Sequence, residues 1–212
     1  MSSFRTPDHA PSGSTLREQL RAATAAAHAR VDAAMPLTRP GVTLTDYQQH
    51  LLILLDWLVA LEQLLPEQAW LADERHAIAQ DAATCTQLLG DAGAPGAPRP
   101  LSLSRWQALL DGPRRDAACW GVRYVIEGSH LGGQVLYRRL STVLAPHPLD
   151  YLRAGGAGTP GEGRWRRFLL ALDDQDWPPP ARRHAIEAAQ AAFELLIACL
   201  DAHGAPLESA TS

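Results

Sequence analysis

The most unusual stretch of this sequence is Tyr124-Val-Ile-Glu-Gly-Ser-His-Leu-Gly-Gly-Gln-Val-Leu136. It lies within an otherwise helix-forming run from about Arg114 to Leu144, although its three glycines each disfavour a helix interior by roughly 1 kcal/mol relative to alanine. Gly128 and Gly132 are four residues apart, so they share one helix face and leave a strip of bare backbone there. Such a strip can receive a flat ligand or a second helix at close range, and the spacing alone does not decide between them.

The composition is that of an ordinary globular protein, with 46% hydrophobic and 20% charged residues in a chain of 212. A net charge of −4 argues against general nucleic-acid binding. All 19 basic residues are arginine, so any site that binds a carboxylate through a cation must use a guanidinium group. The cysteines are Cys85, Cys119 and Cys199, which are odd in number and far apart in the sequence. We therefore expect neither disulfides nor a zinc site, and a protein of the reducing cytoplasm.

The sequence predicts a single helical domain over residues 15–202. Residues 1–14 are polar and lack the apolar core of a signal peptide, so we expect a disordered lead. Residues 203–212 are expected to form a flexible tail. The longest apolar run, Leu51 to Leu65, contains Asp56 and Glu62 and is too short to span a bilayer, so we expect no membrane segment.

The predicted fold class is all-α, a bundle of about seven helices, since the sequence shows no strand-like alternation of any length. The expected helices are Thr15 to Ala34, Thr45 to Leu65, Glu74 to Leu89, a short helix from Ser102 or Ser104 to Leu110, Arg114 to Leu144, Arg164 to Asp173 and Ala181 to Ala202. Capping-box patterns mark the first two starts, at Thr15 with Glu18 and at Thr45 with Gln48. The remaining connections are expected to be loops, at Gly90 to Pro100, Ala145 to Pro148 and Arg153 to Gly163.

A histidine lies at the edge of the apolar stripe on the first expected helix. That stripe is formed by Leu16, Leu20, Ala27 and Val31. His28 lies beside the stripe, with Arg21 one heptad earlier at nearly the same angle and Asp32 one turn later. A lone histidine at such a position is more often a half-solvated side chain than a ligand.

The unusual stretch also carries Glu127 and His130, a Glu-x-x-His pair of the kind that di-iron bundles use twice. We find no second such unit, because Asp73 with His76 lies beside an exposed-looking helix start. A di-iron site is therefore a minor alternative. Nucleophilic catalysis by Ser129 is weaker still, since the strand-turn-helix setting of a nucleophile elbow is missing.

A metalloporphyrin site would use the available residues better. It requires an axial ligand, for which the neutral imidazole of His28 is suitable. It also requires a second helix whose backbone approaches the other face of a flat macrocycle, as Gly128 and Gly132 would allow. Arg21 and Tyr124 are available for the carboxylates at the edge of such a ligand.

These residues resemble the heme oxygenase family, in particular its bacterial biliverdin-producing members that accompany bacteriophytochromes. The resemblance covers about residues 15–202. It rests on Ala-Ala-Ala-His28-Ala-Arg-Val-Asp32 and on Tyr124-Val-Ile-Glu-Gly-Ser-His-Leu-Gly-Gly133, with looser matches at Gly161-Glu-Gly163 and Ala-Ala-Phe193-Glu-Leu-Leu196.

The resemblance implies that heme, as both cofactor and substrate, lies between two helices with His28 as the proximal iron ligand. The other implied contacts are Arg21 and Tyr124 at the propionates, Gly128, Ser129 and Gly132 on the distal side, and Phe193 in the pocket wall. Ser129 stands where other members carry a distal aspartate, so Gly128 and Ser129 are the implied catalytic positions. His130 lies ~160 to 200° from the glycine face, and we expect it to point away toward solvent.

The implied reaction cleaves heme with dioxygen and reductant to biliverdin, carbon monoxide and ferrous iron. It implies an electron donor, either a ferredoxin or a reductase, and a bacteriophytochrome as a possible consumer of biliverdin. By analogy with the family, Arg123, Arg138 and Arg139 form a basic rim for an acidic donor. The alternative is a heme-binding or tetrapyrrole-binding protein without turnover, in which His130 supplies a second axial ligand.

Overall fold

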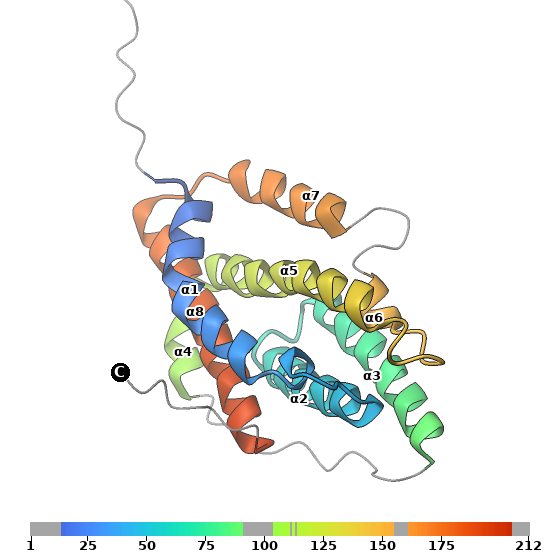
Figure 1. Ribbon diagram of the computed structural model, residues 1–212. Helices are drawn as coiled ribbons and strands as arrows, with labels where there is room; N and C mark the ends of the chain where they lie inside the picture. The colour runs from blue at the N-terminus through green and yellow to red at the C-terminus, as the bar shows by residue number, and fades with distance from the viewer. Residues whose placement is uncertain (1–13, 91–103, 111, 113, 155–160, 205–212) are drawn as a thin grey trace, which may run out of the picture.

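The computed structural model describes residues 14–90, 104–110, 112, 114–154 and 161–204, and these confirm the predicted all-α class. Eight α-helices and one short 3₁₀ helix occur in this part of the chain, close to the expected number. In order they are α1 Leu16–Ala34, η1 Pro36–Thr38, α2 Leu44–Leu64, α3 Ala69–Leu89, α4 Ser104–Leu110, α5 Arg114–Leu140, α6 Asp150–Ala154, α7 Gly161–Asp173 and α8 Pro179–Ala202 (Figure 1). Most of the predicted lead, the Gly90 to Pro100 connection and the tail lie outside the described residues.

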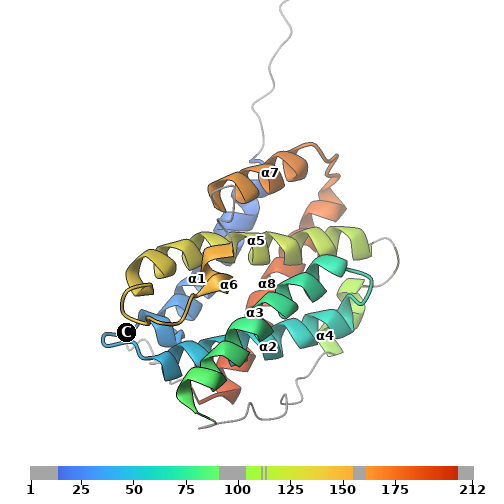
Figure 2. The same cartoon turned by 90° about the vertical axis from the view of Figure 1, so that its right-hand side faces the viewer.

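Helix α8 is the common support of the bundle. It packs against α1, α2 and α5, whereas α1 and α5 make little direct contact with each other. Helix α7 lies on one side of α5, and α2 and α3 lie on the other, as Figures 1 and 2 both show. None of the described helices is long and apolar enough to cross a membrane.

The buried face of α8 is rich in alanine, which lets neighbouring helices approach closely; its members are Ala185, Ala188, Ala189, Ala191 and Ala192. The closest approach is at Gly121 of α5, where an added Cβ would lie 2.0 Å from the carbonyl oxygen of Ala185. An added Cβ at Gly132 would meet no atom within 4 Å among the described residues. Close helix packing is therefore the wrong explanation for Gly132, and it applies to Gly121 instead. A Cβ at Gly128 would make ordinary contact, at 3.9 Å, with the Trp165 ring of α7.

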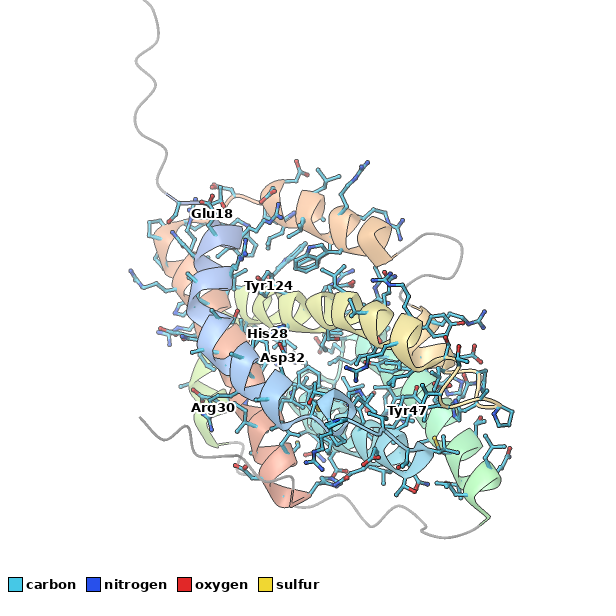
Figure 3. All side chains as sticks on the ribbon, viewed as in Figure 1. Glu18, His28, Arg30, Asp32, Tyr47 and Tyr124 are labelled. Carbon is cyan, nitrogen blue, oxygen red and sulfur yellow. The ribbon has the colours of Figure 1, made fainter. Side chains whose placement is uncertain are left out.

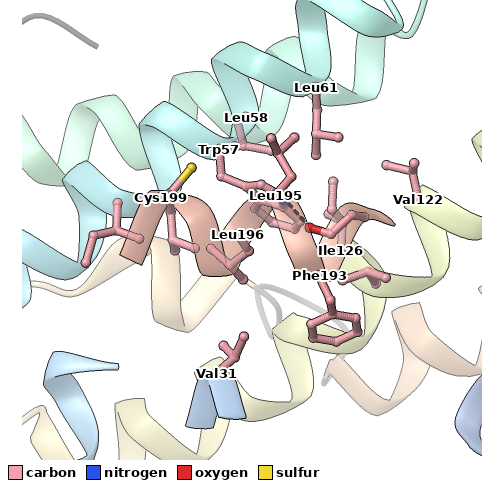
Figure 4. Packing of buried hydrophobic residues seen from close by; sticks show 14 of the residues in the cluster. Val31, Trp57, Leu58, Leu61, Val122, Ile126, Phe193, Leu195, Leu196 and Cys199 are labelled. Carbon is pink, nitrogen blue, oxygen red and sulfur yellow. Dashed lines mark hydrogen bonds between the residues drawn. The ribbon is translucent and has the colours of Figure 1, made fainter. Parts of the chain in front are cut away.

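One apolar cluster joins the helices around α8. Figure 4 shows part of it, with side chains from α1, α2, α5 and α8, including Val31, Trp57, Leu58, Leu61, Val122, Ile126, Phe193, Leu195, Leu196 and Cys199. The indole Nε1 of Trp57 donates a hydrogen bond to the carbonyl oxygen of Ala192 at 2.9 Å. This directional bond fixes α2 against α8 in addition to apolar burial.

The first predicted helix start is confirmed. The Thr15 hydroxyl accepts from the backbone N–H of Glu18 at 3.2 Å, and the Glu18 carboxylate accepts from the backbone N–H of Thr15 at 2.9 Å. The second prediction is wrong, because the capping box of α2 is formed by Thr43 and Asp46. Gln48 is instead buried and donates to the Thr86 hydroxyl on α3 at 3.0 Å, so it is unavailable as a capping residue.

Other boundaries also differ from the expectation. Helix α3 begins five residues before Glu74, and α5 ends at Leu140 rather than Leu144. Residues 161–163 were expected in a loop but form the start of α7, and the short α6 was not expected at all. Helix α8 begins at Pro179 rather than at Ala181. Proline is well tolerated in the first turn of a helix, because an N–H at that position would have no intrahelical partner.

Candidate functional site

His28 is an exposed side chain of α1 with one nitrogen already engaged. Its Nδ1 lies 2.9 Å from Oδ2 of Asp32, one helical turn later, and the His28 side chain is 60% exposed (Figure 3). A carboxylate at this distance favours the tautomer with the proton on Nδ1, which leaves the lone pair of Nε2 in the neutral imidazole for a ligand. A histidine oriented in this way by a carboxylate is suited to bind a metal ion through Nε2.

Phe193 lies beside this histidine. The two ring centroids are 5.9 Å apart with an interplanar angle of 59°, and Phe193 is buried on α8. The phenyl ring therefore restricts the imidazole on the side that faces the core. The structure thus brings together two residues that the sequence analysis placed in one site.

The exposed start of α1 supplies two arginines near Tyr124 of α5. Burial raises the pKa of the Tyr124 phenol, while the positive charges of Arg17 and Arg21 act to lower it. Both guanidinium groups therefore lie within electrostatic range of Tyr124. Sequence reasoning named Arg21 and missed Arg17, although its spacing of four residues from Arg21 places both on one helix face.

The strip at Gly128 and Gly132 is open at one end and covered at the other. Gly132 is exposed, whereas a Cβ on Gly128 would lie 3.9 Å from the indole ring of Trp165 on α7. Val135, three residues beyond Gly132 on the same side of α5, is 57% exposed. The strip is thus a bare, apolar surface, and the sequence analysis overlooked Val135 even though its spacing indicated this position.

Ser129 uses its hydroxyl proton within its own helix. Its Oγ donates to the carbonyl oxygen of Ile126 at 2.7 Å. Burial raises the pKa of Tyr151 on α6, and a hydrogen bond from Ser129 to the phenol oxygen acts to lower it. The single hydroxyl proton of Ser129 therefore has two acceptors within reach, the Ile126 carbonyl and the Tyr151 phenol.

His130 points away from the glycine strip, as expected, but not toward solvent. It is 5% exposed, and its Nε2 lies 3.1 Å from Oε1 of Glu74 on α3. The prediction of a solvent-facing side chain is wrong because α3, a helix distant in sequence, lies on this side of α5. A bis-histidine ligand set made of His28 and His130 is inconsistent with this placement.

The Glu-x-x-His pair is also engaged, because Glu127 accepts from Nε of Arg164 on α7 at 2.6 Å. Within the described ranges, no group of three or more His, Cys, Asp or Glu side chains is arranged to hold a metal ion. The described residues therefore offer no ligand set for the di-iron alternative.

The three arginines expected as a basic rim do not form one surface. Arg123 bonds Glu127 at 3.4 Å and its guanidinium lies over the rings of Trp70 and Phe168. Arg139 donates to the carbonyl oxygen of Leu37. Arg138 is exposed and lies about 22 Å along the helix from Arg123.

The chain is similar to a curated protein of Xanthomonas campestris pv. campestris (strain 8004), with 42% identity over 94 residues. That relative is named heme oxygenase. The matched segment makes up 43% of this chain and 54% of the relative, so the chain spans about half the length of that protein. No protein-family model matches. The homologue supports the resemblance to heme oxygenases on which the expected site residues rest.

Proposed function

We propose that this protein binds heme between α1 and α5 and degrades it as a heme oxygenase. The observation that carries the proposal is the exposed His28 imidazole, whose Nδ1 lies 2.9 Å from Oδ2 of Asp32 and whose Nε2 has no partner among the described residues, in a chain similar to a heme oxygenase. The open backbone at Gly132 supports the proposal, since a flat macrocycle needs such a surface on its second face. The residues present therefore fit heme.

The residues of α1, together with Tyr124 of α5, have proposed tasks in binding the iron and the propionates. Nε2 of His28 binds the iron, and Asp32 keeps Nδ1 protonated and the ring oriented. Arg17 and Arg21 bind the propionates through paired hydrogen bonds, and the Tyr124 hydroxyl donates another. The iron of bound heme supplies the oxygen chemistry, and the heme is itself the molecule that is cleaved.

On the α5 side, Gly132 allows the backbone to lie close to the macrocycle, and Gly128 lies against the Trp165 ring at the edge of the proposed site. Ser129, whose hydroxyl donates to the Ile126 carbonyl, accepts a hydrogen bond from a water molecule near the reacting atoms. We propose biliverdin, carbon monoxide and ferrous iron as products, and a ferredoxin or reductase as electron donor. A bacteriophytochrome is the proposed consumer of biliverdin.

The test is a hemin titration followed by reductive turnover. Hemin should give a sharp Soret band, and ascorbate or a ferredoxin system should convert it to biliverdin, identified by chromatography. His28→Ala should lose the bond between the imidazole and the heme iron, and with it the sharp Soret band. His76→Ala is the matched control, because His76 is also an exposed helical histidine bonded one turn later, to Gln80 at 3.0 Å.

The same experiment distinguishes a heme oxygenase from the alternative, a tetrapyrrole-binding protein without turnover. The specific observation in its favour is that the Ser129 hydroxyl, which cannot exchange a proton as a carboxylic acid would, donates to the Ile126 carbonyl. Stable hemin binding with no biliverdin under either reductant would establish that alternative. An unchanged spectrum in His28→Ala would remove His28 as the ligand in both cases.

A further inference from the structure

A compact charged network joins α3, α5 and α7 next to the candidate site. Arg164 of α7 donates through Nε to Oε2 of Glu127 at 2.6 Å, and through a terminal nitrogen to Glu74. The network also includes His130, at 3.1 Å from Glu74, and Arg123, whose Nε donates to Oε1 of Glu127 at 3.4 Å. The side chains of Glu74 and Glu127 are only 8% and 5% exposed, so both carboxylates lie in the interior.

Arg164 is the group that makes this arrangement possible. Two buried carboxylates that share one neighbour repel each other and have lost their hydration, unless a cation bridges them. Burial raises the pKa of Glu74, but the hydrogen bond and charge of His130 and those of Arg164 outweigh it and hold that pKa below its usual range. Arg164 is thereby tied at once to α3 and to α5.

The residue that follows Arg164 lies on the glycine strip. The Trp165 ring atoms Cη2 and Cζ3 lie 3.9 Å from the position of a Cβ on Gly128. The same ring lies 5.4 Å from the ring of Tyr124 and 5.6 Å from that of Phe168. The strip is consequently covered at Gly128 and open at Gly132.

We propose that Arg164 is a positioning residue that holds Trp165 at the Gly128 end of the strip and so seats the macrocycle toward Gly132 and Val135. Arg164 acts through Trp165 and does not itself touch the ligand. The seating of heme rests on the proposed function, whereas the effect of Arg164 on α7 can be measured in the unliganded protein.

The first measurement is hydrogen exchange of the unliganded full-length chain. In Arg164→Met, the amides of residues 165–169 should exchange at least about tenfold faster than in the wild type, because the first turn of α7 is no longer tied to α3 and α5. The matched control is Arg167→Met, which removes an exposed arginine of the same helix and should leave these rates unchanged. Equal rates in Arg164→Met and wild type would overturn the proposal.

A second variant covers the case in which Arg164→Met does not fold. Combining it with Glu74→Gln and Glu127→Gln removes the two carboxylate charges that Arg164 bridges and keeps the shape of the side chains. We expect this triple variant to recover the unfolding midpoint of the wild type while residues 165–169 still exchange rapidly. Wild-type protection at these amides in the triple variant would show that Arg164 does not position α7.

The ligand measurement compares biliverdin isomers. Arg164→Met or the triple variant should shift the isomer distribution in the same direction as Trp165→Ala, while Arg167→Met keeps the wild-type distribution. An unchanged isomer distribution in Arg164→Met and in the triple variant would overturn the proposal that Arg164 affects how heme is seated. If the wild type binds no hemin, the proposed function and the seating both fail, but the exchange rates still decide whether Arg164 positions α7.

Discussion

Replacing Gly132 by alanine separates the two roles that a helix glycine can have. A methyl group at this position would meet no described atom within 4 Å, so it creates no clash within the fold. Alanine favours a helix interior over glycine by about 0.5–1 kcal/mol, and for a domain of this size about 1 kcal/mol raises the Tm by roughly 2–4 °C. Gly132→Ala should therefore be more stable than the wild type.

The same methyl group should weaken hemin binding. It stands on the open end of the strip, where the macrocycle is proposed to lie against bare backbone, and it holds the ligand away from α5. We expect at least about tenfold lower affinity, which corresponds to about 1.4 kcal/mol. Thermal unfolding measures the first effect, and hemin titration by Soret absorbance measures the second.

Gly121→Ala serves as the contrasting variant. Its methyl group would lie 2.0 Å from the carbonyl oxygen of Ala185, so α5 and α8 would have to separate. Such overpacking typically destabilises a core by about 1–3 kcal/mol or more, and we expect a lower Tm. The reasoning is refuted if Gly132→Ala gains stability but binds hemin like the wild type, or if Gly132→Ala loses stability as Gly121→Ala does.

Three further predictions concern other parts of the molecule. Asp32→Asn should lower hemin affinity about 10–100-fold in a titration, because the partner of Nδ1 loses its charge; equal affinity would contradict this role. Tyr47→Phe removes the bond from the phenol to Oδ2 of Asp81 at 2.6 Å and should lower the unfolding free energy by about 1–3 kcal/mol in urea melts, whereas an unchanged midpoint would disprove it. Burial lowers the pKa of His50, whose Nδ1 has no hydrogen-bond partner in the part of the chain that the structure describes, to about 4. Below pH 6.5 the unfolded chain binds a proton that the folded chain rejects, so stability present at pH 7 is lost as the pH falls toward 4, by about 3 kcal/mol in all. Urea melts across this range should show that loss in the wild type but not in His50→Leu, and parallel curves would refute it.

The parts of the fold that sequence reasoning reached are those with short-range signals. The capping box at Thr15 and Glu18 and the pair of His28 and Asp32 each lie within one helical turn, so spacing alone locates them. Helix α6 has only five residues and no periodic pattern to reveal it. The start of α2 was misplaced because Thr43 with Asp46 has the same spacing as Thr45 with Gln48, and spacing does not reveal that Gln48 bonds α3.

The charged network illustrates what sequence spacing does not reveal. Arg164 is 90 residues from Glu74 and 37 from Glu127 along the chain, and no periodicity relates positions that far apart. The burial of His130 depends on the same packing of α3 against this side of the bundle. Gly121 was overlooked for a similar reason, since its importance comes from Ala185 across the helix interface.

The alanine face of α8 has a consequence for how this site can change during evolution. Helices α1 and α5 both rest on α8 and make little contact with each other, so the width between them follows from the volume of side chains on α8. A larger residue at Ala185, which meets Gly121 of α5, would shift α5 relative to α1. The width of the proposed heme site can therefore be changed by substitutions that lie outside it.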